Sequence, residues 1–135
     1  LCENGALAVG VPFATNNQIG FLITDGDASI KAVCDSGGTE TSTDTGVDLA
    51  DGSVSGGTIS GDRRLGFVVT GTGKVEFYVD RVLKATTTDN IPTSQLTTWV
   101  AAVAGEATAN KVDCDYLFTA AQRQTDGMVQ YSDQV

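Results

Sequence analysis

Residues 65–87 read LGFVVTGTGKVEFYVDRVLKATT, and this stretch decides the fold class. Three runs rich in β-branched and aromatic residues, 65–70, 74–79 and 82–87, are separated by the turn sequences GTG and DR. In KVEFYV every second residue is apolar, which is the periodicity of a strand that buries one face. The stretch therefore predicts three short strands joined by tight turns.

Upstream of this stretch, two apolar runs flank a turn sequence. IGFLIT at 19–24 and ASIKAVC at 28–34 are separated by an Asp-Gly-Asp sequence. Two apolar runs on either side of Asp-Gly predict a β-hairpin. A further run, GALAVGVPF at 5–13, has a proline near its end, which indicates a sheet edge or a strand end.

Downstream, two more strands are expected before the chain becomes polar. TWVAAVA at 98–104 is apolar on both faces, as a central strand covered on both sides would be. In VDCDYLF at 112–118 the two aspartates share one face, and the other face is formed by Val112, Cys114, Tyr116 and Phe118. Residues 119–135 lose this alternation, and we predict that they form an extended arm lying along a neighbouring protein. Its expected contacts are Met128, Val129 and Tyr131.

The acidic stretch 35–62 has a different composition from its surroundings. It contains six acidic residues and seven glycines but no Lys or Arg. A structureless loop of this length is unusual in a compact domain. We therefore expect one or two weak strands within it, around 47–49 and 54–59.

Recurrent strand signals and the near absence of helical periodicity predict an all-β protein. Short strands spaced by turn residues favour an antiparallel two-sheet sandwich of jelly-roll type. We expect a single sandwich domain over residues 1–118, followed by the arm 119–135. The expected core residues are Phe21, Ile23, Cys34, Phe67, Val69, Val75, Phe77, Val79, Val100, Cys114, Tyr116 and Phe118.

Composition excludes several functions. The 135 residues carry 8 Lys and Arg against 17 Asp and Glu, a net charge of −9, and no histidine. Without histidine there is no His-based triad and no His metal ligand. An acidic chain binds polyanions poorly, so neither nucleic acid nor an anionic membrane is an expected partner. No C-x-x-C pair is present; we expect Cys34 and Cys114 to be buried free thiols, while pairing of either with Cys2 stays open.

No residue pattern prescribes a reaction. The sequence has no carboxylates at the spacing of a jelly-roll glycosidase, no G-x-S-x-G elbow and no P-loop. We therefore predict that the protein is not an enzyme and uses no cofactor. Acidic residues in turns and loops can bind calcium, but no EF-hand loop is present, and we interpret these residues as solvated. The weak metal candidates are Asp25, Asp27, Asp44, Asp48 and Asp51.

The second half of the chain carries a more specific pattern. Its parts are VEFYVD at 75–80, Ile91-Pro92, and VDCDY at 112–116. In this order they resemble the closing half of concanavalin A-like, laminin-G-like jelly rolls, such as those of tailed-phage capsid decoration proteins and tail fibres. Arg81 departs from the pattern, because the family usually has glycine after the turn aspartate. A type I′ turn needs positive φ there, and arginine would be strained, so either the turn type differs or Arg81 is held outward for a contact. Its ordinary role would be a solvated turn tip.

The resemblance implies a non-enzymatic virion protein, assembled in the host cytoplasm. We expect a capsid decoration (cement) protein that binds the major capsid protein or other virion subunits, as a homotrimer or another symmetric oligomer. The alternative is a carbohydrate-binding module, for instance of a phage tail fibre. Tyr78 and Trp99 are the candidate sugar contacts, although Trp99 opens an apolar strand and fits a core or interface position as well.

Overall fold

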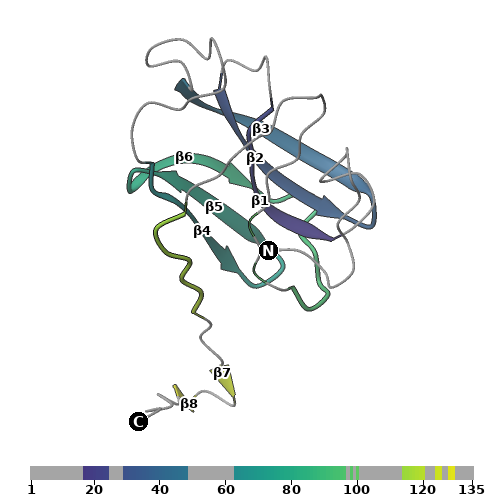
Figure 1. Ribbon diagram of the computed structural model, residues 1–135. Helices are drawn as coiled ribbons and strands as arrows, with labels where there is room; N and C mark the ends of the chain where they lie inside the picture. The colour runs from purple at the N-terminus through teal and green to yellow at the C-terminus, as the bar shows by residue number, and fades with distance from the viewer. Residues whose placement is uncertain are drawn as a thin grey trace.

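The computed structural model describes residues 17–24, 29–48, 63–96, 98, 100, 114–120, 124–125 and 128–129. This part of the chain is all-β and contains two antiparallel three-stranded sheets, which form two layers in Figure 1. The first sheet has the order β1-β2-β3 and the second β4-β5-β6. The strands are β1 (Gln18–Leu22), β2 (Ser29–Ser36), β3 (Thr39–Asp48), β4 (Leu65–Thr70), β5 (Lys74–Val79) and β6 (Val82–Thr87).

The second sheet confirms the strands predicted from residues 65–87. The bounds of β4, β5 and β6 coincide with the three predicted runs. Val75, Phe77 and Val79 of β5 are buried, whereas the residues between them are only half-buried. The hairpin of β1 and β2 is also present, with Ile19 opposite Cys34. Local alternation and turn sequences were therefore sufficient to locate five strands.

β3 was not predicted at its full length. It spans ten residues of mostly polar sequence, TETSTDTGVD, of which only the last two fall in the weak strand expected at 47–49. The β2–β3 turn is formed by Gly37 and Gly38 at φ 63° and 85°. Their N–H groups donate to the side-chain oxygens of Asn17 and Asp35, at 2.9 and 2.8 Å. Glycine accepts this left-handed backbone without strain, so the Gly-Gly pair closes a hairpin.

At a bulge near the end of β3, a side chain of that strand supplies a hydrogen bond to the backbone. Ser29 pairs with Asp48, but Lys31 pairs with Asp44, so β3 holds extra residues opposite Ile30. The Thr45 hydroxyl donates to the Ile30 carbonyl oxygen at 2.6 Å. Buried backbone groups require a hydrogen-bond partner, and here a side chain replaces the missing ladder bond.

The two sheets enclose two buried apolar clusters in the described part of the chain, a larger one and the pair Ile30 and Val79. Phe77 lies in the larger cluster with 1% exposure. Its ring stands edge-on to Phe21 of the first sheet at 5.5 Å and tilted against Phe67 of β4 at 5.9 Å. The Asn90 side-chain amide donates to the Thr41 hydroxyl at 2.8 Å and ties the segment after β6 to β3. The buried members of the larger cluster are Ile19, Ala32, Cys34, Val75, Phe77, Ala85 and Ile91.

Half of the expected core is confirmed. Cys34, Val75, Phe77 and Val79 are buried, and Phe21 and Phe67 pack against the buried clusters. Cys34 is a free thiol, as expected, and burial raises its pKa to about 12.

The other half of the core prediction is wrong. Ile23 lies beyond the end of β1, and Val69 lies on β4, a strand with one partner in the described part of the second sheet. Residues 114–118 belong to no strand, so no neighbouring strand holds their apolar residues against the core. The exposed members are Ile23, Val69, Val100, Cys114, Tyr116 and Phe118.

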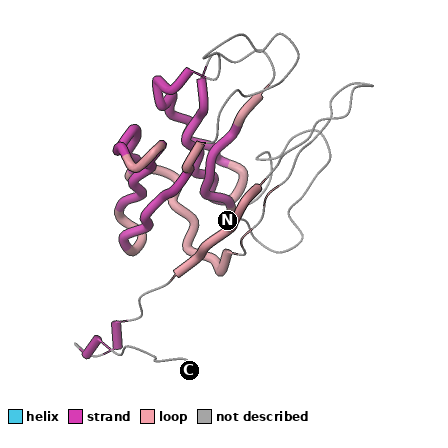
Figure 2. The backbone as a smooth tube through the Cα atoms, turned by 60° about the vertical axis from the view of Figure 1, so that its left-hand side comes forward, coloured by secondary structure: helices cyan, strands magenta, loops and turns pink. Residues whose placement is uncertain are grey.

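The predicted strands at 5–13 and 54–59 lie outside the described residues. Of the strand predicted at 98–104, Thr98 and Val100 are described, and neither is in a strand. Within the predicted arm, β7 (Gln124–Thr125) and β8 (Met128–Val129) pair antiparallel. Both views draw this pair apart from the two sheets (Figures 1 and 2). The division of the chain at residue 118 stays a prediction.

Candidate functional site: the turn and open edge of the second sheet

The β5–β6 turn has a backbone geometry that its second residue, an arginine, disfavours. Val79 pairs with Val82, so Asp80 and Arg81 are the two turn residues. Their φ angles are 52° and 68°. Positive φ at both positions is the signature of a type I′ turn, which normally carries Asn or Asp followed by Gly. The expectation of another turn type is therefore wrong: Arg81 takes the positive φ that strains a residue with a side chain, and that side chain is exposed at the turn tip.

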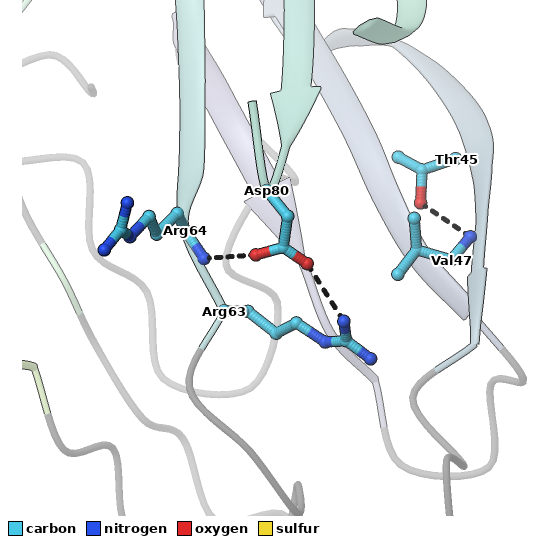
Figure 3. Close-up of polar contacts among 5 residues, drawn as sticks. All are labelled: Thr45, Val47, Arg63, Arg64 and Asp80. Atoms are coloured by element: carbon cyan, nitrogen blue, oxygen red, sulfur yellow. Dashed lines mark hydrogen bonds and ion pairs between the residues drawn. The ribbon is translucent and has the colours of Figure 1, made fainter. Parts of the chain in front are cut away.

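The Asp80 carboxylate anchors the chain as it enters β4. Its two oxygens accept from the Arg64 N–H at 3.0 Å and from Nη1 of Arg63 at 2.9 Å (Figure 3). The Asp80 N–H donates to the Arg64 carbonyl at 2.8 Å. The Arg64 N–H, with help from the Arg63 side chain, lowers the pKa of the Asp80 carboxyl. The Arg64 guanidinium points away from Asp80 (Figure 3). Asp80 and its two arginine partners therefore form a structural clasp between β4 and the turn.

We expect Asp80→Asn to lower stability at neutral pH and to have little effect in acid. Because folding lowers the Asp80 pKa, the carboxylate favours the folded state above about pH 4 and loses that effect as pH falls through the folded-state pKa. Thermal unfolding from pH 7 to pH 2.5 should therefore show the two melting temperatures converging. Asp89→Asn is the control, because the Asp89 carboxylate makes no hydrogen bond within the described residues. A pH-independent difference would contradict the clasp.

We expect Arg81→Gly to stabilise the protein by about 0.5–1 kcal/mol. Glycine removes the Cβ strain at φ 68°, which costs roughly 1–2 kcal/mol in an L-residue, and part of the gain is offset by the larger entropy of the unfolded chain. Urea denaturation measures the change. Lys84→Gly, on the exposed side of β6, should have the opposite sign, because strand backbone gives glycine no such advantage. Destabilisation by both changes would show that the Arg81 side chain makes a contact that offsets its strain.

Apolar side chains are exposed on β4 and on a stretch near the C-terminus. β4 has β5 as its one partner among the described strands, and Leu65, Val68 and Val69 are 40–51% exposed. We call these three residues and the strand that carries them the β4 edge. In the second stretch, residues 114–120, Tyr116 is 72% and Phe118 79% exposed. We call residues 114–120 the exposed segment.

The predicted sugar contacts are only partly placed. Tyr78 is half-buried on the outer face of the second sheet, opposite Leu83. On the same strand, Lys74 and Glu76 form an ion pair at 3.1 Å. Trp99 lies outside the described residues, so the structure does not place it relative to Tyr78.

The candidate calcium ligands do not converge in the described part of the chain. Asp44 Oδ1 accepts from the Ser29 hydroxyl at 2.5 Å and from the Gly46 N–H at 2.7 Å. The hydrogen bond from Ser29 has the larger effect in lowering the pKa of the Asp44 carboxyl, and the bond from Gly46 has the next largest. Asp44 therefore stabilises the bulge of β3. Asp48 ends β3, and Asp25, Asp27 and Asp51 lie outside the described residues. The described residues contain no group of three or more side chains that could hold a metal ion.

Of the predicted partner contacts, Arg81 is exposed and Met128 and Val129 form β8, while Tyr131 lies outside the described residues. Sequence reasoning missed the exposed segment because it assigned Tyr116 and Phe118 to the core. One signal was available: Tyr116-Leu117-Phe118 is a run of three large apolar residues, which breaks the alternation of a half-buried strand.

Comparison with known proteins adds no assignment: no protein family, no curated protein and no solved structure matches this chain. In the described residues, no helix is long and apolar enough to span a membrane.

Proposed function

We propose that this protein is a non-enzymatic structural protein of a virion, most specifically a capsid decoration protein that binds the major capsid protein or neighbouring virion subunits. The observation that carries the proposal is the exposure of large apolar side chains on the β4 edge and the exposed segment. Exposed apolar surface of this kind is more typical of a protein-binding site than of a catalytic site, which is concave.

The fold supports the same proposal. VEFYVD, the best-matching part of the jelly-roll pattern, forms β5 and the first turn residue, and Ile91 and Pro92 are buried after β6. Two antiparallel three-stranded sheets with buried apolar clusters between them are consistent with a β-sandwich, and we propose that the whole domain has jelly-roll topology. Because one fold hosts many functions, this resemblance supports an assembly role without specifying the partner.

Cryo-electron microscopy of capsids assembled with and without the protein tests the proposal. We expect added density in a symmetric array on the outer surface, and we expect decorated capsids to withstand heating better than bare ones. Asp89→Asn gives a matched control, because Asp89 lies outside the β4 edge and its carboxylate makes no hydrogen bond within the described residues. Capsids that show no added density at saturating protein would contradict the assignment.

The alternative, carbohydrate binding, is favoured by one observation, the half-buried Tyr78 on the outer face of the second sheet. A sugar ring can stack on such a side chain. A glycan array read with the wild type and with Tyr78→Ala separates the alternatives. Saturable binding that Tyr78→Ala abolishes would favour the sugar-binding module, and an array without signal would leave the virion protein as the supported function.

A further inference from the structure

We propose that the β4 edge accepts the exposed segment of a second copy of this chain as an added strand, so that the protein self-associates head to tail. This inference deepens the proposed function, because it names one partner for the same apolar surface. Self-association is measurable without capsids, so the two proposals can fail separately.

The β4 edge has the properties of a strand acceptor. Its sequence, LGFVVT, is uncharged, and edge strands normally carry charge or proline to block pairing with another chain. Val68 is 51% exposed on the outer face, and Leu65 and Val69, opposite the buried Val79 and Val75, are also exposed. An added strand would therefore find apolar contacts on both faces as well as backbone hydrogen bonds.

The exposed segment has the properties of a strand donor. Figure 2 draws this stretch, which leads toward β7, as a nearly straight tube, and it belongs to no sheet. Tyr116, Leu117 and Phe118 are 57–79% exposed. The described polar contacts of the segment are few: the Thr119 hydroxyl with that of Thr98 at 2.7 Å, and Cys114 Sγ with the Tyr116 carbonyl at 3.4 Å. Its apolar side chains therefore remain open to a partner.

Three observations favour a second copy over an unrelated partner. The seven residues of the exposed segment match the six residues of β4 in length. The β4 edge carries no charged residue and the exposed segment carries only Asp115, so the two stretches offer little charge for a charged partner to recognise. Every subunit also carries both the donor and the acceptor, and both are exposed in the single chain. A contact between two different surfaces of identical subunits repeats, and it closes into a ring if the rotation permits.

The size of the junction predicts its strength. An aromatic side chain can bury about 150–250 Å², so the two exposed rings together offer about 300 Å² of apolar surface. That is small beside a standard interface of roughly 1,200–2,000 Å². A single junction should therefore be weak, with a dissociation constant on the order of micromolar or above. Each copy carries a net charge of −9, so added salt should strengthen self-association by screening the repulsion between copies. Added salt would instead weaken binding to a basic partner.

Sedimentation velocity over a range of protein concentrations, at low and high salt, tests the proposal. We expect concentration-dependent oligomers that become more abundant with salt. Val68→Lys should weaken association by roughly tenfold or more by blocking the acceptor, and Phe118→Ser should do the same by weakening the donor. Both sites are exposed, so circular dichroism and melting curves should show that each variant is folded. Leu83→Lys is the matched control, because it places the same charge at a 48% exposed position on β6 and should leave association unchanged.

Mixing the two variants decides between head-to-tail and symmetric contact. Val68→Lys retains an intact exposed segment, and Phe118→Ser retains an intact β4 edge. Each variant alone should be monomeric, whereas an equal mixture should form dimers and no larger species, because one junction is restored. A wild type that stays monomeric at high concentration and high salt would overturn the proposal. So would dimers that Leu83→Lys disrupts, or a mixture that restores nothing.

Discussion

Replacement of Phe77 by alanine is expected to destabilise the protein by about 3–5 kcal/mol. The ring is buried and contacts aromatic rings of both sheets, Phe21 across the interface and Phe67 on the neighbouring strand. Removing the ring loses buried apolar area and leaves a cavity at the centre of the shared core. Because strands of both sheets surround this cavity, they cannot easily move together to fill it. Urea denaturation followed by circular dichroism measures the free energy of unfolding.

The control for this change lies on the adjacent strand. Val68→Ala removes apolar atoms from a side chain that is 51% exposed, so the free energy of unfolding should change by no more than about 0.5 kcal/mol. If Phe77→Ala cost less than about 1 kcal/mol, the two sheets would not share the core described above.

Thr45→Val is expected to destabilise the protein by about 1–3 kcal/mol, although the two side chains have nearly the same shape. Thr45 is 5% exposed, and its hydroxyl donates to the Ile30 carbonyl and accepts from the Val47 N–H at 3.3 Å. Valine would leave the Ile30 carbonyl without a partner at the bulge. Figure 3 shows the contact between Thr45 and Val47.

Thr43→Val provides the comparison for Thr45→Val. Thr43 lies two residues earlier on β3, is half-buried, and pairs with Ala32 in the regular part of the ladder. Its backbone bonds do not depend on its hydroxyl, so this change should be close to neutral or slightly stabilising, as valine favours strands. Equal losses for the two variants would show that the bulge does not depend on the Thr45 hydroxyl.

The five strands predicted correctly share one physical property. β5 alternates apolar and polar residues, β4 and β6 are short runs rich in β-branched residues, and turn sequences of two or three residues separate the three strands. β1 and β2 combine apolar runs with a nearby Asp-Gly. Each signal acts between residues close in the chain, so neighbours along the sequence also become neighbours in the sheet. The spacing of apolar residues and the turn residues were therefore sufficient to locate these strands.

The errors lie where burial depends on distant partners. β3 has few apolar residues and was missed, because its place is set by pairing with β2 and by the hydroxyl and carboxylate of Thr45 and Asp44 at the bulge. Cys34 and Cys114 were expected to be alike, yet Cys34 faces the second sheet and Cys114 is exposed. For the candidate site, the sequence identified Asp80 and Arg81 as an unusual turn, but it assigned Tyr116 and Phe118 to the core.

The sequence by itself determined the all-β class, the strands of the second sheet, the buried face of β5 and the position of the β5–β6 turn at Asp80 and Arg81, because alternation and turn residues act locally. The tertiary structure alone decided that Phe77 lies between two sheets, that β3 pairs with β2 in the first sheet, and that Tyr116 and Phe118 remain exposed. An apolar residue is buried only where another element covers it, and that element is chosen by contacts between residues far apart in the chain.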